Sequence, residues 1–125
     1  MSVEWIQYQG KPILYVDERK LRGHELIENL DQTFNVIGKS HDDLVILINE
    51  EDAYISQEYH DRSKELTKAA RLESEAKGHY KVRKTAIVGL DPVKAFLLSG
   101  YNRDTEQNIK AFKTEAEAKE WLIQE

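Results

Sequence analysis

The chain has 125 residues, which is long enough to bury one hydrophobic core. Hydrophobic residues make up 40% of it and charged residues 33%, a composition unlike that of disordered chains. Its 18 Lys and Arg residues against 23 Asp and Glu residues give a net charge of -5, which opposes binding to nucleic-acid phosphates. The absence of cysteine excludes disulfides, thiolate catalysis and cysteine-ligated metal sites.

The start of the chain carries neither the basic segment nor the apolar core of a secretory leader, and no apolar run approaches the roughly 20 residues that cross a bilayer. We therefore expect a cytoplasmic protein without a membrane span. No linker, repeat or low-complexity tract interrupts residues 1–125, which predicts a single domain.

Two short strands joined by a tight turn are predicted first. Val3 to Tyr8 and Pro12 to Val16 are rich in apolar, aromatic and β-branched residues, and the Gln9-Gly10 pair between them is a turn signal. We expect an N-terminal antiparallel hairpin.

An amphipathic helix is predicted from Gly23 to about Lys39. Its apolar residues recur at the spacing that places them on one stripe, and Gly38 near the end is a stop signal. The stripe consists of Leu26, Ile27, Leu30, Phe34 and Ile37.

The middle of the chain predicts a buried strand and then a long helix. Leu44 to Ile48 is a continuous apolar run without alternation, as in a strand covered on both faces. Ser56 to about Lys77 contains neither glycine nor proline, and Gly78 follows it. We expect the helix to pack closely on the sheet through a stripe of mostly small side chains. This stripe consists of Tyr59, Ser63, Leu66, Ala69 and Ala70.

The last third of the chain predicts two further strand and helix pairs. Val82 to Val88 forms the first strand, after which Asp91 and Pro92 suit the start of a short helix that ends at Gly100. Ile109 to Phe112 is predicted as an edge strand. The closing helix begins at a T-x-x-E capping box and docks through apolar residues. These residues are Thr114 and Glu117 for the box, and Ala118, Trp121 and Leu122 for docking.

The predicted order is therefore ββαβαβαβα. Strands that alternate with helices after an opening hairpin indicate an α/β fold with a mostly parallel sheet and right-handed crossovers.

Acidic residues collect where the predicted strands end, and ligands of open α/β sheets bind outside those ends. Such carboxylates could hold a hard cation or perform acid–base chemistry. We expect instead solvated loops and one helix cap, because runs of charge usually face water. The residues are Asp17, Glu18, Glu50, Glu51, Asp52 and Asp91.

Other polar residues give no catalytic or metal motif. The four histidines lack ligand spacing, and no nucleophile elbow, dinucleotide fingerprint or phosphate loop occurs. We expect no metal, cofactor or catalytic residue. A basic stretch could hold an anion, but alternate charges entering a strand commonly protect its edge, which is the role we expect. The histidines are His24, His41, His60 and His79, and the basic stretch is Lys77, His79, Lys81, Arg83 and Lys84.

Ser56 lies at the start of the long helix. Its hydroxyl is expected to cap that helix, and phosphorylation is the alternative because the helix dipole would stabilise the added charge. Leu98 and Tyr101 lie off the inward face of the short helix and form a candidate exposed apolar spot.

The order of elements, together with Asp-Pro-Val-Lys-Ala-Phe-Leu-Leu-Ser-Gly at 91–100 and the ending Trp121-Leu122, resembles the STAS domain. It is most similar to the stand-alone bacterial branch related to CRAL-TRIO lipid-transfer domains. The resemblance implies a β-α superhelix and a binding or regulatory role. Anti-sigma-factor antagonists begin the long helix with an Asp-Ser pair whose serine is phosphorylated. Here Ser56 stands at the aspartate and Gln57 at the serine, so the resemblance does not extend to that switch.

Three functions are compatible with these observations. The leading hypothesis is a non-enzymatic binding module that meets a protein partner through Ser56, Gln57, Leu98 and Tyr101. The second is a carrier of a lipid or another small apolar ligand. The third is an enzyme that uses the acidic rim, which consists of Glu50, Glu51 and Asp52. The sequence gives no oligomeric state.

Overall fold

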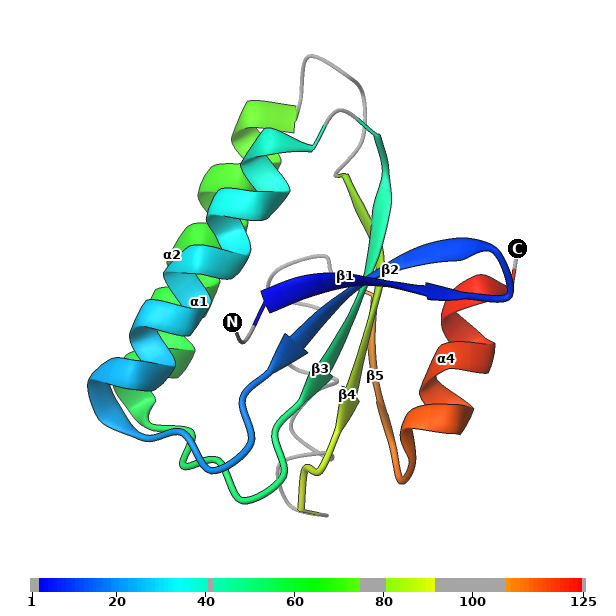
Figure 1. The fold of residues 1–125 in the computed structure, drawn as a ribbon. Coiled ribbons are helices and arrows are strands. Elements are labelled where there is room, and N and C mark those ends of the chain that lie inside the picture. The colour runs from blue at the N-terminus through cyan, green and yellow to red at the C-terminus, as the bar shows by residue number, and fades with distance from the viewer. Residues whose placement is uncertain (1–2, 41, 75–80, 92–107, 125) are drawn as a thin grey trace.

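Figure 1 shows the fold in a computed structural model, which describes residues 3–40, 42–74, 81–91 and 108–124. Strands make up the centre of the molecule. They are β1 (Val3–Tyr8), β2 (Lys11–Asp17), β3 (Leu44–Asn49), β4 (Val82–Val88) and β5 (Ile109–Phe112). The helices described are α1 (Gly23–Lys39), α2 (Gln57–Ser74) and α4 (Glu115–Ile123). The short helix predicted after Asp91, with Leu98, lies outside the described residues, as does Tyr101.

The strands form one sheet in the order β1-β2-β3-β4-β5. β1 and β2 pair antiparallel, and every other neighbouring pair is parallel. β3 is therefore the central strand and β5 an edge strand, as the sequence predicts. The hairpin turn at Gln9 and Gly10 places both residues at positive φ, 49° and 79°, the geometry that favours glycine in two-residue hairpin turns.

Helices cover both faces of the sheet. α1 and α2 lie side by side on one face, and α4 lies on the other (Figure 1). Alternation along β2 supplies both layers, because Leu14 and Val16 belong to the core that Ile37 of α1 joins, whereas Ile13 belongs to the core beneath α4. The predicted α/β fold with a mostly parallel sheet is confirmed.

The stripe predicted for α2 is wrong at one position. Ala69 is exposed, and Thr67 is buried with 3% of its surface exposed. The reason is that the inward face advances by four residues from Tyr59 to Ser63 and again to Thr67. The helix therefore meets the sheet through small side chains as expected, but these include a hydroxyl.

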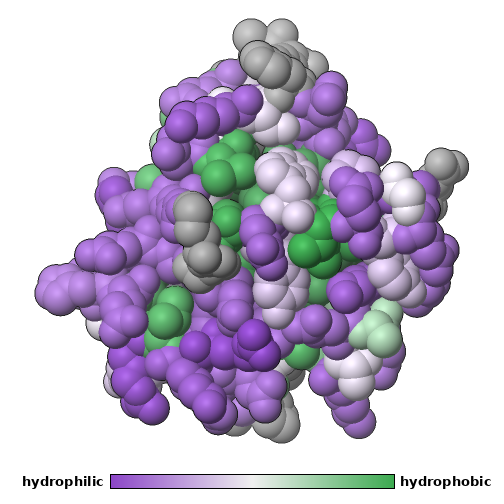
Figure 2. All heavy atoms as spheres, viewed as in Figure 1, coloured by the Kyte–Doolittle hydropathy of each residue, from purple (hydrophilic) through white to green (hydrophobic). Residues whose placement is uncertain are grey.

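The capping box of α4 is confirmed in its main contact, since the Thr114 hydroxyl accepts a hydrogen bond from the Glu117 amide at 3.2 Å. Ala118 and Leu122 are buried below this cap, as predicted. None of the helices in the described part of the chain is long and apolar enough to cross a membrane. The face shown in Figure 2 is mostly hydrophilic, with hydrophobic side chains in small patches.

Candidate functional site at the carboxyl edge of the sheet

The chain makes the same turn after β2 and after β3. The amide of the fourth residue donates to the carbonyl of the first, from Leu21 to Glu18 at 3.1 Å and from Ala53 to Glu50 at 2.9 Å. Each turn leads the chain toward the helix that follows it, α1 or α2. The carboxyl ends of two parallel strands are thus closed by turns that both begin with a glutamate.

These two turns are joined to each other. The Lys20 amide donates to the Glu51 carbonyl at 3.0 Å, and the Tyr54 amide donates to the Leu21 carbonyl at 3.2 Å. Lys20 and Asp52, the third residues of the turns, have φ of 63° and 59°, in the left-handed region that residues other than glycine seldom occupy. Backbone in such conformations is held in place by its surroundings and is frequent at functional sites.

The glutamates that begin the turns form a buried pair, which we call the carboxyl pair (Glu18 and Glu50). Asp17 lies opposite Asn49 in the parallel register, so the next residues, Glu18 and Glu50, continue side by side on the same face. The backbone pairing extends this far, because the Glu18 amide donates to the Asn49 carbonyl at 2.9 Å. Only 1% of Glu18 and 7% of Glu50 is exposed.

Side chains from both covering helices contact Glu18. The Tyr59 hydroxyl of α2 lies 2.9 Å and 3.0 Å from the two carboxyl oxygens, Oε1 and Oε2, and donates to them. The Asn29 amide of α1 donates to Oε2 at 3.3 Å. Glu50 also acts on Glu18, in the direction that lowers the pKa of Glu18. The carboxyl pair thus connects the ends of β2 and β3 with α1 and α2.

Burial raises the pKa of Glu18 from its ordinary 4.5 to about 7, because the charged carboxylate loses its hydration. The hydrogen bonds from Tyr59 and Asn29 act in the opposite direction, and the negative charge of Asp17 adds to the rise in pKa. Glu18 therefore has its pKa close to neutral pH.

Gly89, immediately after β4, packs against the carboxyl pair's backbone. The Glu50 amide donates to the Val88 carbonyl at 2.8 Å, and a Cβ atom on Gly89 would lie 2.5 Å from the Glu51 nitrogen. Gly89 also has φ of 93°. This position thus requires glycine for both space and conformation.

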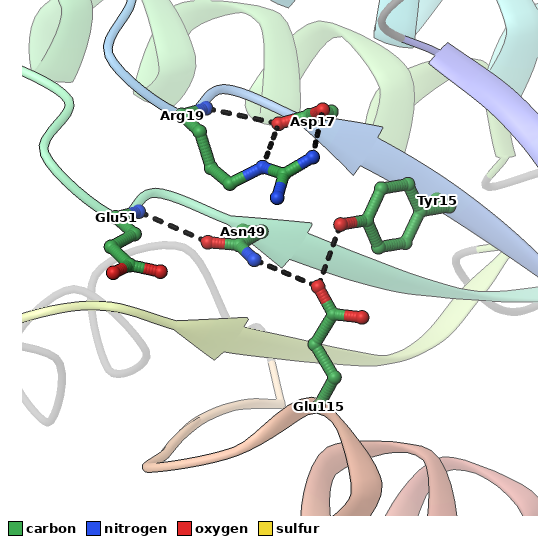
Figure 3. Close-up of polar contacts among 6 residues, drawn as sticks. All are labelled: Tyr15, Asp17, Arg19, Asn49, Glu51 and Glu115. Carbon is green, nitrogen blue, oxygen red and sulfur yellow. Dashed lines mark hydrogen bonds and ion pairs between the residues drawn. The ribbon is translucent and has the colours of Figure 1, made fainter.

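A second polar cluster lies on the opposite face of the same strands (Figure 3). Glu115 of α4 accepts from the Tyr15 hydroxyl at 2.6 Å and from the Asn49 amide at 2.7 Å. Burial and the bond to Glu115 raise the pKa of Tyr15 to about 12. The Asn49 side-chain oxygen Oδ1 in turn accepts a hydrogen bond from the Glu51 backbone amide at 3.1 Å, so this cluster connects α4 to the turn after β3.

The expectation that the acidic residues lie in solvated loops is therefore wrong for Glu18 and Glu50. Strand alternation continues one residue past each strand and turns both side chains inward, beneath α1 and α2. Asp17 is partly exposed and paired with Arg19 at 2.9 Å, whose hydrogen bond lowers the pKa of the Asp17 carboxyl.

The acidic rim proposed for an enzyme does not converge. Glu50 is buried in the carboxyl pair, whereas Glu51 and Asp52 are exposed. In Figure 3 the Glu51 carboxylate points away from Asn49 and Glu115. The geometry gives no acid–base arrangement of these three residues.

Ser56 caps α2, as predicted, because its hydroxyl accepts a hydrogen bond from the Tyr59 amide at 3.1 Å. Gln57 is exposed, and its side-chain amide donates to Asp61 at 2.9 Å. The cap and the carboxyl pair therefore share Tyr59, whose backbone meets Ser56 and whose hydroxyl meets Glu18.

The described part of the basic stretch makes intramolecular contacts. Lys81 Nζ donates to the Ser40 carbonyl at 2.7 Å, and Arg83 pairs with Asp43 at 3.1 Å. Lys84 Nζ donates to the Trp121 carbonyl at 2.9 Å. These contacts agree with a structural role, while Lys77 and His79 lie outside the described residues.

The described residues border an internal cavity and a surface hollow near this edge. The cavity, of about 60 Å³, lies between the sheet and the pair of helices, and Glu18, Tyr59, Ser63 and Thr67 are among its lining residues. Pockets that bury small ligands commonly measure roughly 300–1,000 Å³, so this cavity does not favour a lipid carrier. The surface hollow, of about 480 Å³, is lined by Lys20, Arg22, Asp52, Ala53 and Tyr54.

Within the described ranges, no three histidine or acidic residues are grouped so that they could hold a metal ion. The sequence did contain a signal for the carboxyl pair. Glu18 continues the inward series Leu14 and Val16, and Glu50 continues Ile46 and Ile48, each at the two-residue period of a strand.

A comparison with solved structures identifies a protein of similar fold. It is an uncharacterized protein of the DUF3478 family from Shewanella loihica PV-4, whose crystal structure is described as having a SpoIIAA-like fold. The TM-score is 0.64 at 17% sequence identity, over 96% of this chain and 91% of that chain. The chain therefore has a SpoIIAA-like fold, which agrees with the STAS-like fold predicted from its sequence. No family model matches the sequence, and no curated protein matches it significantly.

Proposed function

We propose that this chain is a non-enzymatic binding or regulatory module of STAS-like type, which recognises a protein partner at the carboxyl edge of its sheet. The observation that carries the proposal is the hollow at this edge, next to the start of α2. Tyr54 lines it with 60% of its surface exposed, and tyrosine is enriched at protein interfaces because its ring supplies apolar area and its hydroxyl a hydrogen bond.

Exposed polar groups surround this tyrosine. Lys20, Arg22 and Asp52 line the hollow with it, and the half-buried Ser56 and the exposed Gln57 follow along the chain. An aromatic residue within a polar rim is the usual composition of a protein-binding patch. Leu98 and Tyr101 remain candidates for the same surface from the sequence pattern alone, because they lie outside the described residues.

Affinity capture with the tagged chain tests this surface. We expect at least one protein from the source organism to be retained by the wild type and reduced about tenfold or more by a Tyr54→Ala, Gln57→Ala double variant. Leu72→Ala is the control, because Leu72 is also exposed but lies near the far end of α2. The captured protein is then purified, and its binding to the wild type, to the double variant and to Leu72→Ala is titrated. Equal retention of every captured protein by the double variant would contradict the proposed surface.

A further inference from the structure

Thr85 of β4 has a buried hydroxyl that the described part of the chain leaves without a hydrogen bond. Its backbone amide donates to the Asn108 carbonyl at 3.0 Å, but its side chain takes part in none of the hydrogen bonds that the described residues make. Only 6% of Thr85 is exposed, so bulk solvent does not hydrate this hydroxyl. Buried polar side chains bond in their large majority to protein or to ordered water, which makes ordered water the expected partner of Thr85.

The register of the sheet places the Thr85 side chain beneath the helix pair. Thr85 lies opposite Ile46 in the parallel pairing of β4 with β3, and Ile46 belongs to the core that Ile37 of α1 joins. Because opposite residues of neighbouring strands point to the same face, Thr85 also faces α1 and α2. It accordingly lines the internal cavity of about 60 Å³ between the sheet and these helices.

The cavity has the size and the polar lining that a water molecule needs. Internal water requires roughly 10–15 Å³ of space and two to four polar partners. Ser63 and Thr67 of α2 and the Glu18 carboxyl line the cavity together with Thr85. Ser63 and Thr67 make other interactions. Each of their hydroxyls has one proton and two lone pairs, so a further hydrogen bond with water is compatible with these interactions.

The inward face of α2 explains why space remains at this place. Ser63 and Thr67 on that face are small, and β4 presents a threonine where the neighbouring strand has Ile46. Small side chains on both elements leave a gap that close packing fills elsewhere in protein interiors. Water in this gap connects α2 to β4.

We propose that the cavity is an internal water site, in which at least one ordered water molecule accepts a hydrogen bond from the Thr85 hydroxyl and donates to a hydroxyl of α2. Water is the class of ligand that both the volume and the hydroxyl lining select. The site goes beyond the proposed function and does not depend on it, because the cavity lies inside the fold and apart from the partner surface.

Oxygen-17 magnetic relaxation dispersion tests the site on the full chain, because it counts water molecules that stay inside a protein for longer than the protein takes to rotate. We expect at least one such molecule in the wild type. Thr85→Val keeps the shape of the side chain and exchanges the hydroxyl for a methyl group, so the count should fall by about one.

Thr33→Val is the matched control. Thr33 is similarly buried and lines the same cavity, but its hydroxyl donates to the Asn29 carbonyl at 2.8 Å. Its proton is therefore not needed to hold the water, and this variant should retain the wild-type count.

Xenon locates the result within the molecule, because xenon enters dry apolar cavities. The methyl groups of Val16 and Ile46 line the cavity and report on it in carbon-13 spectra under xenon pressure. We expect their signals to keep their positions in the wild type and to shift in Thr85→Val.

A wild-type chain without a long-lived water molecule would overturn the proposal, as would xenon-induced shifts at Val16 and Ile46 in the wild type. An unchanged count in a folded Thr85→Val chain, or an equal fall in Thr33→Val, would reject Thr85 as the residue that holds the water. Should Thr85→Val fail to fold, the two wild-type measurements still decide between a hydrated and a dry cavity.

Discussion

Gly89 combines a left-handed backbone with a close approach to the turn that follows β3. We predict that Gly89→Ala lowers the free energy of unfolding by about 2 kcal/mol or more, because the added Cβ meets the Glu51 backbone and the φ of 93° is strained for alanine. Denaturant unfolding measures the change. Gly38→Ala is the control, since Gly38 lies in α1 and a Cβ there meets nothing within 4 Å. Equal stabilities of the two variants would contradict the requirement for glycine at position 89.

At the scale of single residues, the sequence predicts the helix caps but does not predict which acidic residues are buried. The caps at Ser56 and Thr114 are predictable because a hydroxyl at a helix start bonds a local amide, whatever the rest of the fold does. The burial of Glu18 and Glu50 depends on α1 and α2 closing over the strand ends. Their burial therefore depends on contacts with residues that are distant in the sequence, whereas the local run of charged residues predicts that they are exposed.

The start of α2 depends on one hydroxyl. We predict that Ser56→Ala lowers the free energy of unfolding by about 1 kcal/mol, because the Tyr59 amide loses its acceptor. Ser56→Asp should keep most of the wild-type stability, since a carboxylate caps the helix and its charge interacts favourably with the helix dipole. Urea unfolding of the wild type and of the two variants measures these free energies. If Ser56→Asp were as unstable as Ser56→Ala, the serine would have a role other than the cap.

At the scale of elements, periodicity and stop signals predict most of the fold. The run from Leu44 to Ile48 has no alternation because β3 is covered on both faces, by the helix pair and by α4. The exact inward face of α2 is harder to predict, because its mean pattern is polar and its packing uses Thr67 and Ser74. Small polar side chains carry a weak periodic signal, so the choice between Thr67 and Ala69 is made by tertiary packing.

For the whole molecule, the carboxyl pair predicts a stability that falls as the pH rises toward neutrality. The folded pKa of Glu18 is about 7 and its ordinary value is 4.5, so its protonated form stabilises the fold fully below pH 4.5 and this contribution is lost as the pH rises through about 7. Asp17 acts in the opposite sense at low pH, because its pKa is lowered and its contribution is lost on acidification.

Denaturant unfolding across this pH range measures the net effect. We expect the wild-type free energy of unfolding to fall by roughly 1–3 kcal/mol between pH 5 and pH 8, and Glu18→Gln to abolish most of that fall. Glu51→Gln should follow the wild type. A wild-type stability that rises steadily over this interval would mean that other groups, and not the carboxyl pair, control it.

The measurement that tests the carboxyl pair most directly is a nuclear magnetic resonance titration of the Glu18 side-chain carboxyl carbon in the folded wild-type chain. A midpoint close to pH 7 is the predicted result, because burial favours the protonated form of Glu18. A Glu18 midpoint near the ordinary value of 4.5 would contradict it.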